Sequence, residues 1–144
     1  MTMTLTQALA RHDITVADEL LAAIEVPILT GVQRQGDILI APRPPLGAAE
    51  RTSMTPVPRE GVAVVRGEAT GNTHLLDAVQ GEVLWGPNPH AGPTDLTYGI
   101  LHVPDGAIAH LLHTDEHGCN GVGPGTYRLV GKREMAEEIR RVAD

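Results

Sequence analysis

Nine residues, HTDEHGCNG at 113–121, carry two histidines, two carboxylates and the only cysteine of the chain. Imidazole nitrogen and thiolate sulfur are ligands that zinc prefers in tetrahedral sites. His113, His117 and Cys119 supply three such ligands within one segment, and we expect His74 to supply a fourth from a neighbouring strand. The alternative is a polar turn, with solvated histidines and with Cys119 as a small buried side chain.

The pattern H-x-x-E-H at 113–117 also occurs in one class of zinc peptidase. In this chain Glu116 would then be the general base, with both histidines one turn apart on a helix. Gly118, Gly121 and Pro124 follow at once and break any helix, so the sequence disfavours a peptidase.

Two other interpretations of the same region have less support. Cys119 has His117 nearby in sequence, but a nucleophile needs an oriented base and a lowered pKa, and neither follows from sequence. The run GILHVPDGAIAH at 99–110 loosely resembles a metal motif of cupin barrels. Its histidine is displaced by one position, and a β-turn at 104–106 explains the same residues.

The local structure of residues 105–118 decides how these histidines lie. A helix would place His110, His113 and His117 on one face. A strand would instead place His110 among apolar neighbours and end in a turn at His113. We favour the strand, because the rest of the chain also carries strand signals.

Short apolar and β-branched runs bounded by glycine and proline predict the other strands. They lie at 36–42, 61–76 (two strands about a turn), 81–85, 94–104 and 125–133. Sixteen Gly and eleven Pro favour tight turns over long helices, and the absence of Phe makes the core aliphatic. We therefore predict a mainly β fold, a compact barrel or sandwich of about seven to eight short strands.

Helices are expected near both ends of the chain. An amphipathic pattern covers residues 15–25, and a weaker helical signal precedes it at 5–11. Residues 133–143 form a second amphipathic pattern. We divide the chain into an N-terminal helical segment, 1–26, and a single β-rich domain, 27–144, that ends in a helix.

Charge and composition disfavour several classes of partner. The net charge is −7, the Lys and Arg residues are scattered, and aromatic residues make up 2%, so a nucleic acid would find neither a basic stripe nor stacking platforms. No apolar run approaches the length of a membrane span, and the first residues lack the pattern of a secretory signal. We expect a cytoplasmic protein or a soluble component of a phage-related assembly.

Three segments in order resemble an uncharacterised family of small β-rich proteins from bacteria and their viruses. They are GEATGNTHLL, HTDEHG and GPGTYRLVGKRE, against family patterns G-E-x-T-G-H-x-H, H-x-x-H and PGxYxVxxxRE. The resemblance spans 36–144 and implies no activity. By position it picks out His74, Glu116, His117, Pro124, Gly125, Tyr127, Arg133 and Glu134. Asn72 stands where the family has a histidine, and an amide oxygen is a weaker ligand for zinc.

Two functions follow as hypotheses. The first is a non-enzymatic binding or accessory module of a larger protein assembly, with a protein partner and a homo-oligomeric state. Strand edges, the proline-rich segment 43–58 and the amphipathic helices would offer the contact surfaces. The second is a zinc-type metal-binding enzyme or sensor that uses the histidine cluster, with Glu116 as base.

Overall fold

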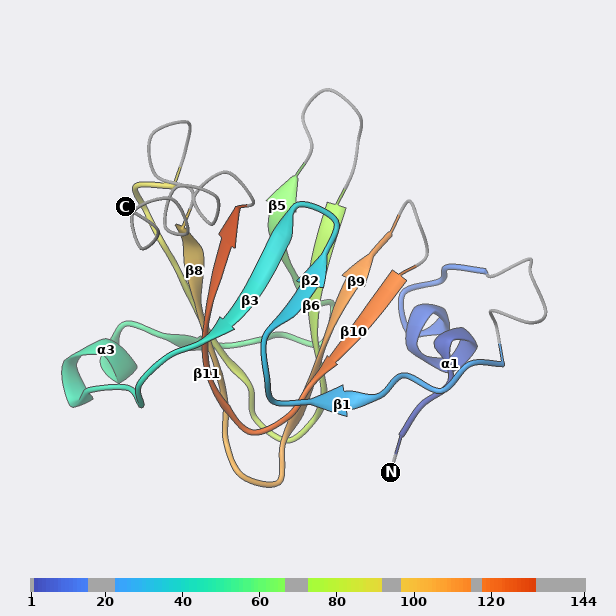
Figure 1. The fold of residues 1–144 in the computed structure, drawn as a ribbon, viewed down its shortest axis with the longest axis horizontal. Coiled ribbons are helices and arrows are strands. Elements are labelled where there is room, and N and C mark those ends of the chain that lie inside the picture. The colour runs from blue at the N-terminus through green and yellow to red at the C-terminus, as the bar shows by residue number, and fades with distance from the viewer. Residues whose placement is uncertain (1, 16–22, 67–72, 92–96, 115–117, 132–144) are drawn as a thin grey trace, which may run out of the picture.

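The chain folds into two β-sheets that pack against each other, as shown by a computed structural model that describes residues 2–15, 23–66, 73–91, 97–114 and 118–131 (Figure 1). One sheet has five strands in the order β1-β10-β9-β6-β5. The other has six, in the order β2-β3-β11-β8-β7-β4. The predicted mainly β fold is confirmed, and because the sheets form no closed barrel the architecture is sandwich-like.

The five-stranded sheet consists of β1 (Ile28–Leu29), β5 (Val62–Arg66), β6 (Thr73–Gln80), β9 (Ile108–His113) and β10 (Gly118–Val122). The six-stranded sheet consists of β2 (Gln33–Gln35), β3 (Ile38–Pro42), β4 (Thr55–Pro56), β7 (Leu84–Pro87), β8 (Thr97–Val103) and β11 (Gly125–Gly131). The described residues thus hold eleven strands, more than the seven to eight expected. The difference arises because β1, β2 and β4 are too short to give a periodic signal.

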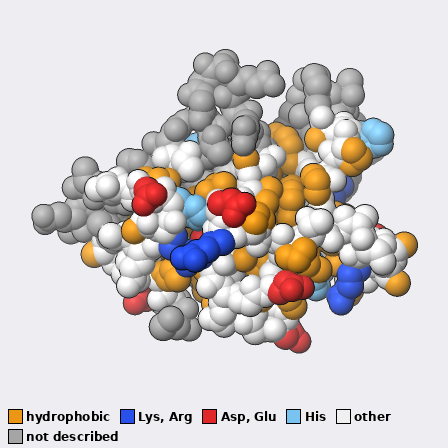
Figure 2. Space-filling model, turned by 180° about the vertical axis from the view of Figure 1, so that it is seen from behind, with side chains coloured by type: hydrophobic (Ala, Val, Ile, Leu, Met, Phe, Trp, Pro, Cys, Tyr) orange, Lys and Arg blue, Asp and Glu red, His pale blue; other side chains and the backbone are white. Residues whose placement is uncertain are grey.

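An aliphatic core fills the space between the sheets. Leu101 and Leu129 of the six-stranded sheet and Leu76 and Leu111 of the five-stranded sheet are fully buried in it. Burial of such side chains is the main source of stability in a fold of this size. Some apolar side chains stay at the surface, and Figure 2 shows them across the middle of one face with charged groups around them.

The helix α1 (Leu5–Ala10) lies beside β10, on the outer face of the five-stranded sheet (Figure 1). Thr4 and Gln7 form a capping box at its N-terminus. Leu9 is fully buried in a second apolar cluster with Leu112 and Val26. The sheet is therefore covered by apolar contacts on both faces.

The helical predictions meet the structure in part. The helix expected at 5–11 is present as α1. Residues 16–22 of the one expected at 15–25 lie outside the described residues, and its expected end is wrong, because residues 23–25 are not helical and Glu25 forms an antiparallel bridge with Thr4. The helix expected at 133–143 also lies outside them. Residues 105–118 contain the strand β9, as favoured, and the proline-rich segment contains a short helix, α3 (Ala48–Thr52), that was not predicted.

Candidate functional site

His74 and His113 lie side by side at one end of the sandwich. They are partners in the antiparallel pairing of β6 and β9, and their rings stack with centroids 4.3 Å apart and planes 9° from parallel. Alternation along the strands places both on the inner face, with Leu76 and Leu111. The turn at Gly36 lies over the rings, so the pair is 6% and 4% exposed.

Gln35 fixes the orientation of this histidine pair. Its Nε2 donates to the carbonyl oxygen of Leu111 at 2.6 Å and to Oδ1 of Asn120 at 3.0 Å, so its Oε1 faces His74. Nδ1 of His74 lies 2.8 Å from that oxygen and therefore carries the proton and donates. Gln33 likewise donates to the carbonyl oxygen of Gly121, so side chains of β2 bond to the opposite sheet.

The expected zinc site is only partly assembled by this geometry. His74 and His113 are together, but Cys119 pairs with Leu112 and so projects from the opposite face of the sheet. His117 and the expected base Glu116 lie outside the described residues. Imidazole lone pairs lie in the ring plane, so two parallel rings direct them in parallel and not at one ion. Within the described ranges, no group of three or more His, Cys, Asp or Glu is arranged to hold a metal.

A second polar cluster lies on the outer face of the same sheet, beside α1. Asp77 is 0% exposed, and Nε of Arg11 donates to its Oδ2 at 2.7 Å. Nη2 of Arg11 reaches Oδ1 at 3.4 Å and the carbonyl oxygen of Ala78 at 3.5 Å. Nε2 of His12 lies 3.1 Å from Oδ2, and His110 faces Asp77 across the strand pair.

The charges in this cluster hold one another in place. Burial opposes ionisation of Asp77, but the hydrogen bonds from Arg11 and the contact with His12 outweigh it and hold the pKa of the carboxyl below its ordinary value. Burial lowers the pKa of His110 to about 4, so this ring is neutral at pH 7. Its Nδ1 is buried without a hydrogen-bond partner among the described residues.

Cys119 lies on the same outer face as Asp77 and packs in the apolar cluster below α1. Burial raises the pKa of its thiol to about 12, and the nearby Asp77 carboxylate acts in the same direction. The thiolate is the nucleophilic form, so the thiol is unreactive near neutral pH. This environment fits a partly buried filler side chain.

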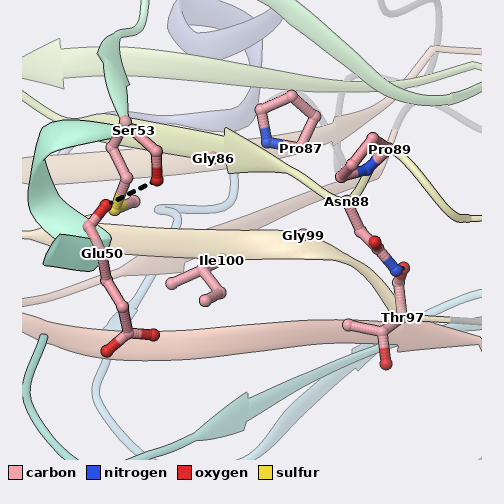
Figure 3. Close-up of a pocket in the computed structure, with 10 residues that line it drawn as sticks. Glu50, Ser53, Gly86, Pro87, Asn88, Pro89, Thr97, Gly99 and Ile100 are labelled. Carbon is pink, nitrogen blue, oxygen red and sulfur yellow. Dashed lines mark hydrogen bonds between the residues drawn. The ribbon is translucent and has the colours of Figure 1, made fainter.

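An open groove crosses the outer face of the six-stranded sheet, with a cavity of about 570 Å³. Figure 3 shows Glu50 and Ser53 of the α3 region on one side, Pro87 and Pro89 on the other, and Ile100 between them. Ser53 donates to the carbonyl oxygen of Glu50, so this hydroxyl is engaged in the turn. The apolar side chains of its described lining are Met54, Pro87, Pro89 and Ile100, and this lining includes neither histidine nor cysteine.

A more polar cavity of similar volume lies beyond α3, where Arg51 and His102 line it. Nδ1 of His102 bonds to Oγ1 of Thr126 at 3.0 Å, and Nη2 of Arg51 lies 3.5 Å from Nε2. Burial, and then the charge of Arg51, lower the pKa of His102. Nη1 and Nη2 of Arg43 donate to Oε2 and Oε1 of Glu50, at 2.7 and 3.0 Å.

Sequence reasoning missed the Asp77 cluster and the surface around β1. Asp77 stands in an apolar run, THLLDAVQ, and a carboxylate inside a strand pattern is a signal of a buried partner. The position of that partner, Arg11, has no local signature. The second feature is the set of three exposed apolar side chains Ile24, Leu29 and Val32. They stand close together in sequence, but their exposure is visible only in the structure.

The structure is thus a mainly β sandwich that has buried polar clusters and an open groove on one sheet. Residues 34–132 match a domain of unknown function, DUF8820, and the chain belongs to this family. The match contains His74, Asp77, His110 and His113, while Arg11 precedes it. Searches against curated proteins and against solved structures found no match. Membership of an uncharacterised family is confirmed, and the bacterial and viral distribution stays a prediction.

One further finding bears on environment. In the part of the chain that the structure describes, no helix has the length and apolar character needed to cross a bilayer.

Proposed function

We propose that this protein is a non-enzymatic binding module of a larger protein assembly, and that residues 24–32 form the surface that contacts another chain. One observation carries the proposal. The large hydrophobic side chains that are exposed among the described residues all lie in this segment: Ile24 (53%), Leu29 (47%) and Val32 (63%). Exposed apolar side chains this close in sequence can form a common interaction surface.

The fold holds this segment against the domain. Leu29 pairs with Val122 of β10, and the N–H of Gly123 donates to the carbonyl oxygen of Leu29 at 2.9 Å. A Cβ at Gly121 would clash with the carbonyl oxygen of Pro27, so glycine at this position permits the close approach. A surface held in one conformation loses less entropy on binding, which favours association.

Both sheets have an edge at this surface. β1 is the edge of the five-stranded sheet and β2 is the edge of the six-stranded sheet, with Val32 directly before β2. Edge strands can accept a strand from another chain, and apolar neighbours add buried area. We take a second copy of this chain as the partner, because two identical surfaces of this kind satisfy one another across a two-fold axis.

The polar clusters support binding over catalysis. Asp77, His110, His74 and His113 are at most 6% exposed, so a substrate has little access to them. Cys119 is held as a protonated thiol. These groups are therefore either covered or chemically quiet, whereas His102 lines an open cavity and its Nδ1 is bonded to Thr126.

Sedimentation velocity over a range of protein concentrations tests the proposal. We expect the wild-type protein to self-associate and the double variant Leu29→Asp with Val32→Asp to be a monomer with unchanged circular dichroism. The control, Ala48→Asp with Ala49→Asp, adds the same charge at exposed positions of α3 and should still associate. A monomeric wild type, or a double variant that still associates, contradicts the proposal.

A zinc-binding enzyme or sensor is the second candidate, supported by the contact between His74 and His113. One ring would have to turn for both nitrogens to reach the same ion, and His117 would add a third ligand. Elemental analysis of the purified protein, followed by calorimetric titration with zinc, tests this candidate. Binding that the double variant His74→Ala with His113→Ala abolishes would support it, and absence of zinc in both measurements would reject it.

A further inference from the structure

The Arg11–Asp77 pair joins two parts of the chain with different roles. Asp77 and Ala78 lie on β6, inside the range that matches the domain family, whereas Arg11 lies before that range. The acceptor oxygens therefore belong to the domain, and the cation comes from the N-terminal segment. The side chain of Asp77 is 1% exposed and that of Arg11 is 34% exposed, so the cation approaches from the solvent side.

The acceptor has the shape of a guanidinium site. Nε and Nη2 of Arg11 meet the two carboxylate oxygens of Asp77, and Nη2 also reaches the carbonyl oxygen of Ala78. A planar guanidinium can address two carboxylate oxygens at once, whereas an ammonium is a point charge. The geometry of the acceptor thus selects arginine over lysine.

A second observation is that a polar atom of the domain at this site has no hydrogen-bond partner in the described structure. His110 faces Asp77 across β6 and β9 and is 1% exposed, yet its Nδ1 is buried without a hydrogen-bond partner in the described structure. A buried nitrogen of this kind is costly unless a donor or acceptor reaches it. His110 therefore brings to the site a buried polar atom that Arg11 does not bond.

We propose that Asp77, the Ala78 carbonyl and His110 form an arginine-binding site of the domain, which Arg11 fills from within the same chain. A guanidinium group supplied from outside, such as an arginine side chain of a partner, enters this site when Arg11 is absent or displaced. The proposal is independent of the surface at residues 24–32.

Rescue by a small guanidinium compound tests this site in the full-length chain. Arg11→Ala removes the guanidinium and leaves His12 beside Asp77. Methylguanidinium at about 100 mM should raise the Tm of this variant by about 3 °C relative to methylammonium. The wild type, whose site is filled, and the double variant Arg11→Ala with Asp77→Asn should show no such difference. The ring signals of His110 in NMR spectra should shift in the single variant only.

Two results would contradict the proposed arginine-binding site. Equal responses to methylguanidinium and methylammonium would show a simple charge effect, and an equal response of the double variant would place the effect elsewhere. Either result overturns the proposal. If Arg11→Ala does not fold, Arg11→Gln provides a neutral side chain of similar length for the same comparison.

Discussion

The carboxylate of Asp77 and the imidazole of His110 face each other from adjacent strands, and both are buried, at 0% and 1% exposure. The guanidinium of Arg11, 66 residues from Asp77 in the sequence, neutralises the carboxylate. Because His110 is uncharged at neutral pH, the cluster depends on one ion pair. The N-terminal segment is therefore bound to the sheet by electrostatic contacts as well as by Leu9.

Asp77→Asn should destabilise the protein by about 2 kcal/mol, because it removes the charge that Arg11 and His12 contact while leaving a buried polar side chain. Urea unfolding monitored by circular dichroism measures the loss. Glu50→Gln is the control, since it breaks the partly exposed ion pair with Arg43 and should cost much less. Similar losses in the two variants would contradict a special role for the buried pair.

Stability should fall as the pH is lowered from 6.5 to 4. His110 has a folded-state pKa of about 4, below its ordinary value of 6.5, so in this window the unfolded chain binds a proton that the folded chain does not. The difference corresponds to about 3 kcal/mol. The lowered pKa of Asp77 acts in the same direction at lower pH, because its contribution is complete above the ordinary value of 3.8 and is lost as the pH falls below it through the folded value.

Replacement of His110 by Leu separates these two contributions. The variant removes the group that titrates between pH 6.5 and 4, so its unfolding free energy should change much less across that window. The polar neighbours of this ring, Asp77, Arg11 and His12, are retained in the variant. An unchanged pH dependence would show that another group is responsible.

Gly121→Ala should loosen β1 from β10, because the added Cβ would meet the carbonyl oxygen of Pro27. We expect a loss of about 1–3 kcal/mol. We also expect faster hydrogen exchange of the Gly123 amide, which donates to Leu29. Gly118→Ala is a matched control on the same strand. Its added Cβ would lie 3.6 Å from the Cβ of His113, which is an ordinary van der Waals contact. Equal effects of the two substitutions would contradict this account.

The elements with regular patterns were predictable from sequence. β3, β8 and β11 are β-branched or alternating runs bounded by glycine or proline, and they appear where expected. β10, with the sequence GCNGV, carried no such pattern. Its Gly121 serves the close approach of β1, which is a tertiary requirement that local propensity does not report.

The candidate site was predictable only in its residue types. The sequence indicated His74 and His113 because imidazoles are chemically distinctive, and the strand pairing brings them together. The same pairing sends Cys119 to the other face, since neighbouring residues of a strand point in opposite directions. Contacts such as Arg11 with Asp77 depend on how distant segments pack, and no spacing in the sequence encodes them.

Gln35 offers the sharpest test of the polar network inside the sandwich. Gln35→Leu removes the donor to Leu111 and Asn120 and the acceptor for His74, and these buried groups then lack that partner. We expect a loss of about 2 kcal/mol in urea unfolding, together with loss of the slowly exchanging Nδ1 proton of His74 in NMR spectra. Gln80→Leu is the control, because Gln80 is exposed and donates a single bond to Gly106. Persistence of that imidazole proton in Gln35→Leu would show that another group holds His74 in its orientation.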